Sequence, residues 1–271
     1  MVGILLKSLV GLTLGMMVAE PASAEGEFLS LMPDYLPHFA GLGMGYIPDY
    51  MGSDDMVFGV APVIYLNWGE RYVNLQANYL SINLLDDPNW RMGPAGLLRF
   101  GRDDVEDPVI RQLPRIHDTL ELGAFVTYRF NPSNDVRDIW AVSAQVLHDT
   151  LGTHGGYSLS AGVQRWLPVW RVSAVGFSLA ATHGSSDYLG TYFSVSPAAS
   201  RASGLPEYRL GEGMRDIRTS AVFIQPLSPS LFLGIGVLYS RLLGDVAKSP
   251  IVSDRGSRDQ LIYGMGLAVT F

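Results

Sequence analysis

The chain has 271 residues, of which 48% are hydrophobic and only 17% charged, with 30 glycines and no cysteine. Without cysteine it can form no disulfide, no cysteine zinc site, no iron–sulfur cluster and no thiol nucleophile. The net charge of −7 argues against non-specific binding of nucleic acid, which needs a basic surface, and the apolar content is too high for a disordered chain.

The first 24 residues have the pattern of a secretory signal peptide. Lys7 supplies the positive charge, Leu9 to Val18 form an apolar stretch, and Ala22-Ser23-Ala24 is a small-x-small cleavage site. The apolar stretch is too short for a membrane-spanning helix, which needs about 20 residues. We therefore predict a signal peptide at 1–24 and a mature domain over 25–271.

From residue 40 to the C-terminus, large apolar residues recur at every second position within successive segments. Because successive residues of a strand point to opposite faces, each segment has one large apolar face and one small or polar face. In chain order the segments are 40–46, 56–67, 73–79, 91–101, 120–130, 139–148, 157–166, 172–182, 187–195, 214–225, 231–240 and 261–271, and 187–195 has the weakest pattern.

This alternation occurs in soluble β-sandwiches and in membrane barrels, and three other features favour the barrel. Most segments are about 10–12 residues long, which matches tilted strands that cross a bilayer. Charged residues are concentrated between the segments. Aromatic residues stand near segment ends, as in an interfacial girdle: Tyr46, Trp68, Tyr72, Tyr79, Trp90, Phe100, Phe130, Trp140, Trp166 and Trp170.

A sheet within a bilayer must close on itself to satisfy its backbone hydrogen bonds, and bacterial single-chain barrels have an even number of strands. We therefore predict an all-β fold, an antiparallel transmembrane β-barrel in the outer membrane of a Gram-negative bacterium. Twelve strands are expected, or ten if two of the poorer segments belong to loops.

The last segment, Leu261–Phe271, fixes the orientation. Its large residues continue on one face to the terminal aromatic residue, Phe271, which resembles the signal that outer-membrane barrels present for assembly. Because this strand should finish in the periplasm, we expect the short turn 226–229 to be periplasmic and the longer segment 242–259 to be external.

Five polar residues are predicted to face the lumen: Arg99, Glu121, Arg129, Gln145 and Gln164. A lone charge there is costly unless it is hydrated, so we expect these side chains to pair across the lumen. Because a barrel of twelve strands is narrow, the hypothesis is a plugged or very narrow lumen.

Several residues resemble catalytic or metal sites, but turn chemistry explains them better. His148-Asp149 with His154, and His183 with Asp187, superficially resemble a hydrolase triad, although Gly, Ser and Asp are first of all turn formers. The acidic residues at 103–107 lack the order of a calcium loop, and Gly41–Gly45 has no following helix for a phosphate site. We expect no catalytic, cofactor or metal site and no enzymatic activity.

A series of loop motifs, in order along the chain from about residue 38 to Phe271, resembles the MipA/OmpV family of outer-membrane proteins (the MltA-interacting protein family). The stretch Gln112 to His117 departs from the family pattern. The matching motifs are Tyr46-Ile-Pro-Asp-Tyr50, Gly52-Ser-Asp-Asp55, Gly69-Glu-Arg-Tyr72, Gly101-Arg-Asp-Asp104, Asp118-Thr-Leu-Glu-Leu-Gly123, His154-Gly-Gly156, Ser186-Asp-Tyr188, Thr191-Tyr-Phe193, Tyr239-Ser-Arg-Leu-Leu-Gly-Asp245 and Ser249-Pro-Ile-Val252.

This resemblance implies a non-enzymatic barrel that contacts outer-membrane lipid and lipopolysaccharide. It also implies a scaffold that brings a lytic transglycosylase (a murein hydrolase) and a penicillin-binding protein (a murein synthase) together during murein synthesis. The family offers no accepted catalytic residues to transfer. A narrow outer-membrane channel or porin-like pore is the alternative function.

Overall fold

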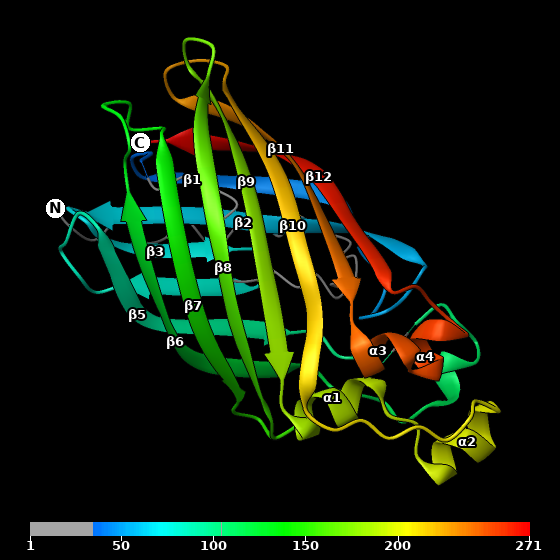
Figure 1. The fold of residues 1–271 in the computed structure, drawn as a ribbon. Coiled ribbons are helices and arrows are strands. Elements are labelled where there is room, and N and C mark those ends of the chain that lie inside the picture. Colours follow the sequence, from blue (N-terminus) through cyan, green and yellow to red (C-terminus); the bar gives the residue numbers. More distant parts are fainter. Residues whose placement is uncertain (1–34, 104) are drawn as a thin grey trace, which may run out of the picture.

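The computed structural model describes residues 35–103 and 105–271, and the predicted signal peptide, 1–24, lies outside this range. Twelve antiparallel strands form a closed barrel in which each strand pairs with its neighbours in the sequence and β1 pairs with β12 (Figure 1). The strands are β1 Phe39–Pro48, β2 Met56–Trp68, β3 Arg71–Gln76, β4 Tyr79–Asn83, β5 Trp90–Arg99, β6 Thr119–Phe130, β7 Ile139–Asp149, β8 Tyr157–Val169, β9 Ser173–Gly184, β10 Gly213–Pro226, β11 Leu231–Leu242 and β12 Asp259–Thr270.

The barrel turns its large apolar side chains outward, as the alternation predicts. Leu42 of β1 pairs with Leu267 of β12, and the two side chains are 54% and 50% exposed. On the same two strands Gly43 pairs with Gly266 and faces the lumen. Such exposure is unfavourable in water but matches the lipid-facing band of an outer-membrane barrel.

The connections at the two ends of the barrel differ in length. Near the Phe39 and Thr270 ends of β1 and β12, the strands are joined by short segments at 69–70, 84–89, 131–138, 170–172 and 227–230. At the opposite end the long segments 100–118, 185–212 and 243–258 connect the strands. Because outer-membrane barrels have short periplasmic turns and longer external loops, this pattern agrees with the predicted orientation.

One predicted strand is wrong, because 187–195 forms a helix. The helix α1, Ser186–Phe193, begins after Ser185, whose side chain accepts a hydrogen bond from the backbone N–H of Tyr188. Its buried residues are Tyr188, Leu189, Tyr192 and Phe193. Their spacing of three to four residues places them on one helix face, so the apolar pattern here has the helical period.

A second prediction is also wrong, because the segment 73–79 is not one strand. It contains the end of β3, a turn and the first residue of β4. The chain turns at residues 77–78 between β3 and β4, and Ala77 has a φ of 52°. The backbone N–H of Ala77 donates to the carbonyl of Pro62 at 2.8 Å. The side-chain amide of Asn78 donates to the backbone carbonyl of Leu98, also at 2.8 Å. The predicted total of twelve strands is nevertheless right, because the strand wrongly predicted at 187–195 offsets β4, which was not predicted.

Three residues assigned to the aromatic girdle instead face the interior. Tyr79 lies beyond the unrecognised turn and donates a hydrogen bond to the side chain of Gln145 at 2.5 Å. Tyr72 packs on Tyr65. Trp166 is two residues from Gln164 and therefore shares its inward face, where it is 1% exposed.

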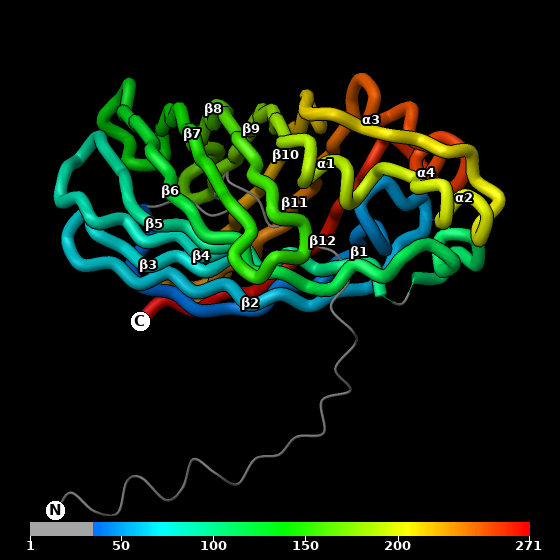
Figure 2. The backbone as a smooth tube through the Cα atoms, turned by 90° about the horizontal axis from the view of Figure 1, so that it is seen from below, coloured from blue at the N-terminus to red at the C-terminus, as the bar shows by residue number. Residues whose placement is uncertain are grey.

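Helices and loops gather at the external end of the barrel (Figures 1 and 2). The helices α1, α2 (Pro197–Ser203), α3 (Gly244–Lys248) and α4 (Pro250–Ser253), with the 3-10 turn η1 (Ile110–Gln112), form two apolar clusters. We call this assembly of 100–118, 185–212 and 243–258 the external cap. Among the described residues, no helix is long and apolar enough to span a membrane.

Candidate functional site: the polar lumen and its external cap

Two of the three histidines that resembled a hydrolase site, His148 and His183, point away from the lumen. His148 of β7 is exposed on the outer face, and His183 of β9 pairs with the outward residues Leu159 and Met214. Neither can meet the serine and aspartate side chains inside the barrel. His154, by contrast, lies inside and is buried.

The acidic segment before η1 has a structural role. Its Asp107 carboxylate accepts hydrogen bonds from the backbone N–H groups of Val109 and Ile110 and from Arg255 at 2.6 Å. The N–H of Glu106 donates to Asp49, which joins this loop to the β1–β2 turn. Asp104 lies outside the described residues, and the described part of the chain holds no group of three metal-ligating side chains.

Of the five residues predicted to line the lumen, Arg99 and Glu121 come together. The Arg99 Nε donates to one carboxylate oxygen of Glu121 at 2.5 Å and a terminal nitrogen donates to the other at 3.0 Å. The two strands are neighbours, so the pair runs along the wall and does not cross the lumen. The side-chain oxygen of Gln145 accepts a hydrogen bond from the hydroxyl of Tyr79. Near the periplasmic end, the Arg129 guanidinium donates a hydrogen bond to the side-chain oxygen of Asn131. Gln164 is inward and half-buried.

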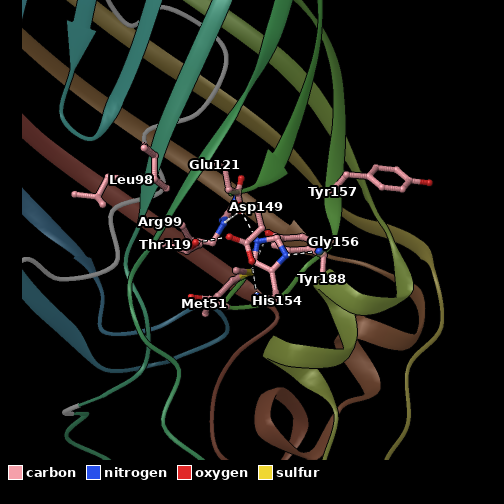
Figure 3. Close-up of polar contacts among 12 residues, drawn as sticks. Met51, Leu98, Arg99, Thr119, Glu121, Asp149, His154, Gly156, Tyr157 and Tyr188 are labelled. Carbon is pink, nitrogen blue, oxygen red and sulfur yellow. Dashed lines mark hydrogen bonds and ion pairs between the residues drawn. The ribbon is translucent and has the colours of Figure 1, made fainter. Parts of the chain in front are cut away.

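The Arg99–Glu121 pair continues into the loop 150–156 (Figure 3). His154 Nδ1 accepts the N–H of Gly156 at 3.0 Å, so Nε2 carries the hydrogen that is donated to Glu121 at 2.9 Å. Asp149 accepts the N–H groups of His154 and Gly155, at 2.6 and 2.8 Å. These contacts fix the loop against the inner wall.

Two tyrosines of α1 cover this network from the cap side. The guanidinium of Arg99 lies 4.9 Å from the ring centre of Tyr188 and 5.9 Å from that of Tyr192. Arg102, in the loop after β5, donates to the backbone carbonyl of Tyr192 at 3.2 Å. Burial lowers the pKa of Arg102 to about 10, so it remains charged at neutral pH.

A second ionic group, on β10, was not predicted from the sequence. Arg215 and Asp216 are adjacent in the sequence yet both are buried, because the pairing with β9 shifts between Met214 and Asp216 as in a β-bulge. Asp216 contacts Arg215 through one oxygen and Arg218 through the other, the latter at 3.2 Å. The sequence does contain a signal for this ionic group, because β10 carries three charged residues although its other face is apolar.

A pocket inside the barrel adjoins this group. Asp216, Arg218, Ser240 and Gln260 form its polar side. Its apolar side is formed by Pro48, Tyr50, Met51, Leu238, Leu242 and Ile262. The site therefore combines a charged wall with an apolar wall directly beneath the cap.

The family comparison agrees with this architecture. Residues 40–271 match the family described as MltA-interacting protein MipA. The chain belongs to this family. The MipA-family barrel is accordingly a protein of the outer membrane, with the lipid-facing band described above.

Other comparisons are more distant. No curated protein matches the sequence. Among solved structures, the chain is similar to the NanC porin, with a TM-score of 0.49 and 9% identity over 86% of this chain and 100% of that one. It is also similar to an outer membrane channel from Pseudomonas putida F1, with a TM-score of 0.40 and 12% identity over 93% of this chain and 100% of that one.

Proposed function

We propose that this MipA-family barrel is a non-enzymatic scaffold of the outer membrane that links a lytic transglycosylase and a penicillin-binding protein in murein synthesis. Membership of the family, which is described by its interaction with MltA and matches residues 40–271, is the observation that carries the proposal. Lipid and lipopolysaccharide would hold the barrel in place through its apolar outer face.

A murein enzyme would reach the barrel from the periplasm, so the short turns are the surface to consider. Three neighbouring turns among them expose large apolar side chains. Trp170 is 77% exposed in the β8–β9 turn, and Val136 and Leu227 are exposed in the 131–138 and 227–230 turns. The Arg137 guanidinium donates to the Ser173 carbonyl at 2.9 Å, and Trp170 packs on Phe223, so these turns are neighbours. We call Val136, Trp170 and Leu227 the periplasmic turn patch.

Direct binding to a purified soluble MltA-type transglycosylase, with the barrel in nanodiscs, tests the proposal. Replacing all three patch residues with serine should weaken binding at least about tenfold, since buried aromatic anchors dominate such interfaces. The control Leu151→Ser changes an exposed apolar residue of the external loop 150–156 and should leave binding unchanged. Absence of binding by the unaltered barrel would contradict the scaffold, and equal binding by the triple variant would exclude the patch.

The polar inner wall favours a narrow channel as the second candidate function. Glu121, Gln145 and Arg218 are polar side chains on that wall, and they would line a path for small solutes if the cap opened. Conductance distinguishes the two functions, because a scaffold needs no open path through the lumen.

A further inference from the structure

The inner wall of the barrel is apolar near the periplasmic turns and polar above them. On β7 the inward residues change from Ile139 and Ala141, beside the turn, to Ser143. On β10 they change from Ile224, near the 227–230 turn, to Ser220. Ile139 and Ile224 are 3% and 1% exposed, although side chains on the wall of a water-filled lumen would be wet. The periplasmic end of the lumen is therefore filled.

Two clusters of inward apolar side chains lie at this end. Trp166 of β8 belongs to one cluster and Tyr65 of β2 to the other. The strands β8 and β2 are six positions apart in the closed order of twelve, so these two side chains come from opposite sides of the barrel. The first cluster is Ile139, Trp166, Ala174, Val222 and Ile224, and the wall residues of the second are Phe39, Tyr65 and Ala268.

Two side chains join the clusters across the lumen. Tyr35, from the segment before β1, packs against both clusters, and so does Phe232 of β11. Leu36 is itself a buried member of the second cluster. We call 35–38 the strap, and the wall residues of both clusters together with Phe232 the apolar floor. Because Tyr35 contacts both clusters, the strap lies across the periplasmic end of the lumen.

The strap is fixed to the sheet through His38. The His38 carbonyl accepts the N–H of Phe271 at 3.0 Å, and the His38 Nδ1 accepts the N–H of Asn67 at 3.0 Å. Tyr35 and Leu36 precede the first strand, so their withdrawal leaves the hydrogen-bond ladders of the barrel intact. Segments outside such ladders open at a lower cost in free energy than strands do. The strap can therefore move about His38 while the barrel remains folded.

We propose that the strap is a periplasmic gate of the lumen, which Tyr35 and Leu36 close by seating in the apolar floor and open by leaving it. An apolar constriction excludes water and therefore ions, and withdrawal of the two side chains lets water enter. The gate lies at the end of the barrel opposite the external cap. It concerns the lumen, so it stands whether or not the periplasmic turns bind a murein enzyme.

Thiol labelling in nanodiscs tests the gate, because the chain has no cysteine and one introduced thiol reports local access. Ser143→Cys places a thiol just above the apolar floor. A charged trimethylammonium methanethiosulfonate reagent should modify it at least about tenfold more slowly than the thiol of Ser230→Cys, in an exposed periplasmic turn. Adding Tyr35→Ser with Leu36→Ser should speed modification at position 143 about tenfold, because the strap then no longer seats in the floor.

Two controls separate the gate from general loosening. Leu84→Ser with Val172→Ser changes two exposed apolar residues of periplasmic turns and should leave the rate at position 143 unchanged. Val146→Cys, on the lipid-facing side of the same strand, should stay unreactive with and without the strap changes, which shows that the barrel is intact. Fast modification at position 143 beneath an unaltered strap, or a slow rate that the strap changes leave as it is, would overturn the gate.

Single-channel recording provides an independent test. A barrel in which a glycine–serine linker replaces 186–209 lacks α1 and α2, and the gate should interrupt its current with frequent closures. Adding Tyr35→Ser with Leu36→Ser to that barrel should lengthen the mean open time at least about tenfold, whereas Leu84→Ser with Val172→Ser should not. Equal open times with and without the strap changes would show that the strap does not control the lumen.

Discussion

Arg99 and Glu121 are the residues on which the inner wall depends at the external end. Both are almost fully inaccessible, and each has further contacts, with Tyr188 and His154 respectively. Removing one partner of a buried pair leaves an uncompensated charge, which costs about 3–5 kcal/mol. We expect Arg99→Leu to lower the free energy of unfolding by that amount, measured by urea titration of the barrel in vesicles with tryptophan fluorescence.

The control for this prediction is an ion pair at the surface. Lys248 and Asp245 are joined at 2.8 Å, but both are largely exposed, and such pairs contribute little. Lys248→Ala should therefore leave the unfolding midpoint unchanged. If Arg99→Leu behaved in the same way, the pair would not stabilise the barrel.

Asp107 makes the cap sensitive to acid. Burial raises its pKa, but the N–H groups of Ile110 and Val109 and the guanidinium of Arg255 outweigh burial and hold the pKa below its ordinary value. A carboxylate whose pKa is lowered by folding stabilises the fold at pH values above the pKa of the unfolded state, which is about 4. This contribution to stability is lost as the pH falls through the lower pKa of the folded state. Hydrogen exchange of 105–113, corrected for its intrinsic pH dependence, should show loosening below about pH 4.

The variant Asp107→Asn should show faster exchange of 105–113 already at neutral pH and should lack the acid step. Asp187→Asn, at an exposed position of α1, should keep the profile of the unaltered chain. Persistence of the acid step in Asp107→Asn would assign it to another group.

At the scale of the elements, a strand could be predicted correctly where the alternation of apolar and small or polar residues extended over the whole segment. β12 and β6 show ten or more residues of uninterrupted alternation, and their outward faces were predicted correctly. The segment 187–195 is too short for its helical period to be recognised easily, and only the capping residue Ser185 and the pairs Tyr188–Leu189 and Tyr192–Phe193 indicate the helix. The turn at 77–78 has no glycine, so its sequence lacks the usual hairpin signal.

Ala77 tests that turn. Its φ of 52° is unfavourable for residues with a side chain and most of all for β-branched ones. Ala77→Gly should therefore be neutral or stabilising by up to about 1 kcal/mol, whereas Ala77→Val should destabilise the barrel by more than about 1 kcal/mol. Urea unfolding midpoints of the two variants measure the difference, and equal midpoints would mean that the turn is not formed as described.

At the scale of the molecule, the sequence indicated the barrel well and its interior poorly. Outward residues follow from local alternation, whereas the partners of inward residues depend on strand register. Arg99 and Glu121 could be placed inside, but their pairing along neighbouring strands, and the covering of both by Tyr188, required the long segment 185–212 to be positioned. The Arg215–Asp216–Arg218 group additionally depended on a bulge that alternation alone does not predict.

The external cap should keep the lumen nearly closed to ions. The cap packs two apolar clusters, which include Tyr188 and Phe193 from α1, over the external end. In planar bilayers we expect the unaltered barrel to show no conductance steps of the size of a general porin. Replacing 186–209 by a short glycine–serine linker removes α1 and α2 and should raise the conductance several-fold, whereas replacing 151–153 at the tip of a separate external loop should not. Porin-sized steps from the unaltered barrel would mean that the cap does not close the lumen and would favour the channel over the scaffold.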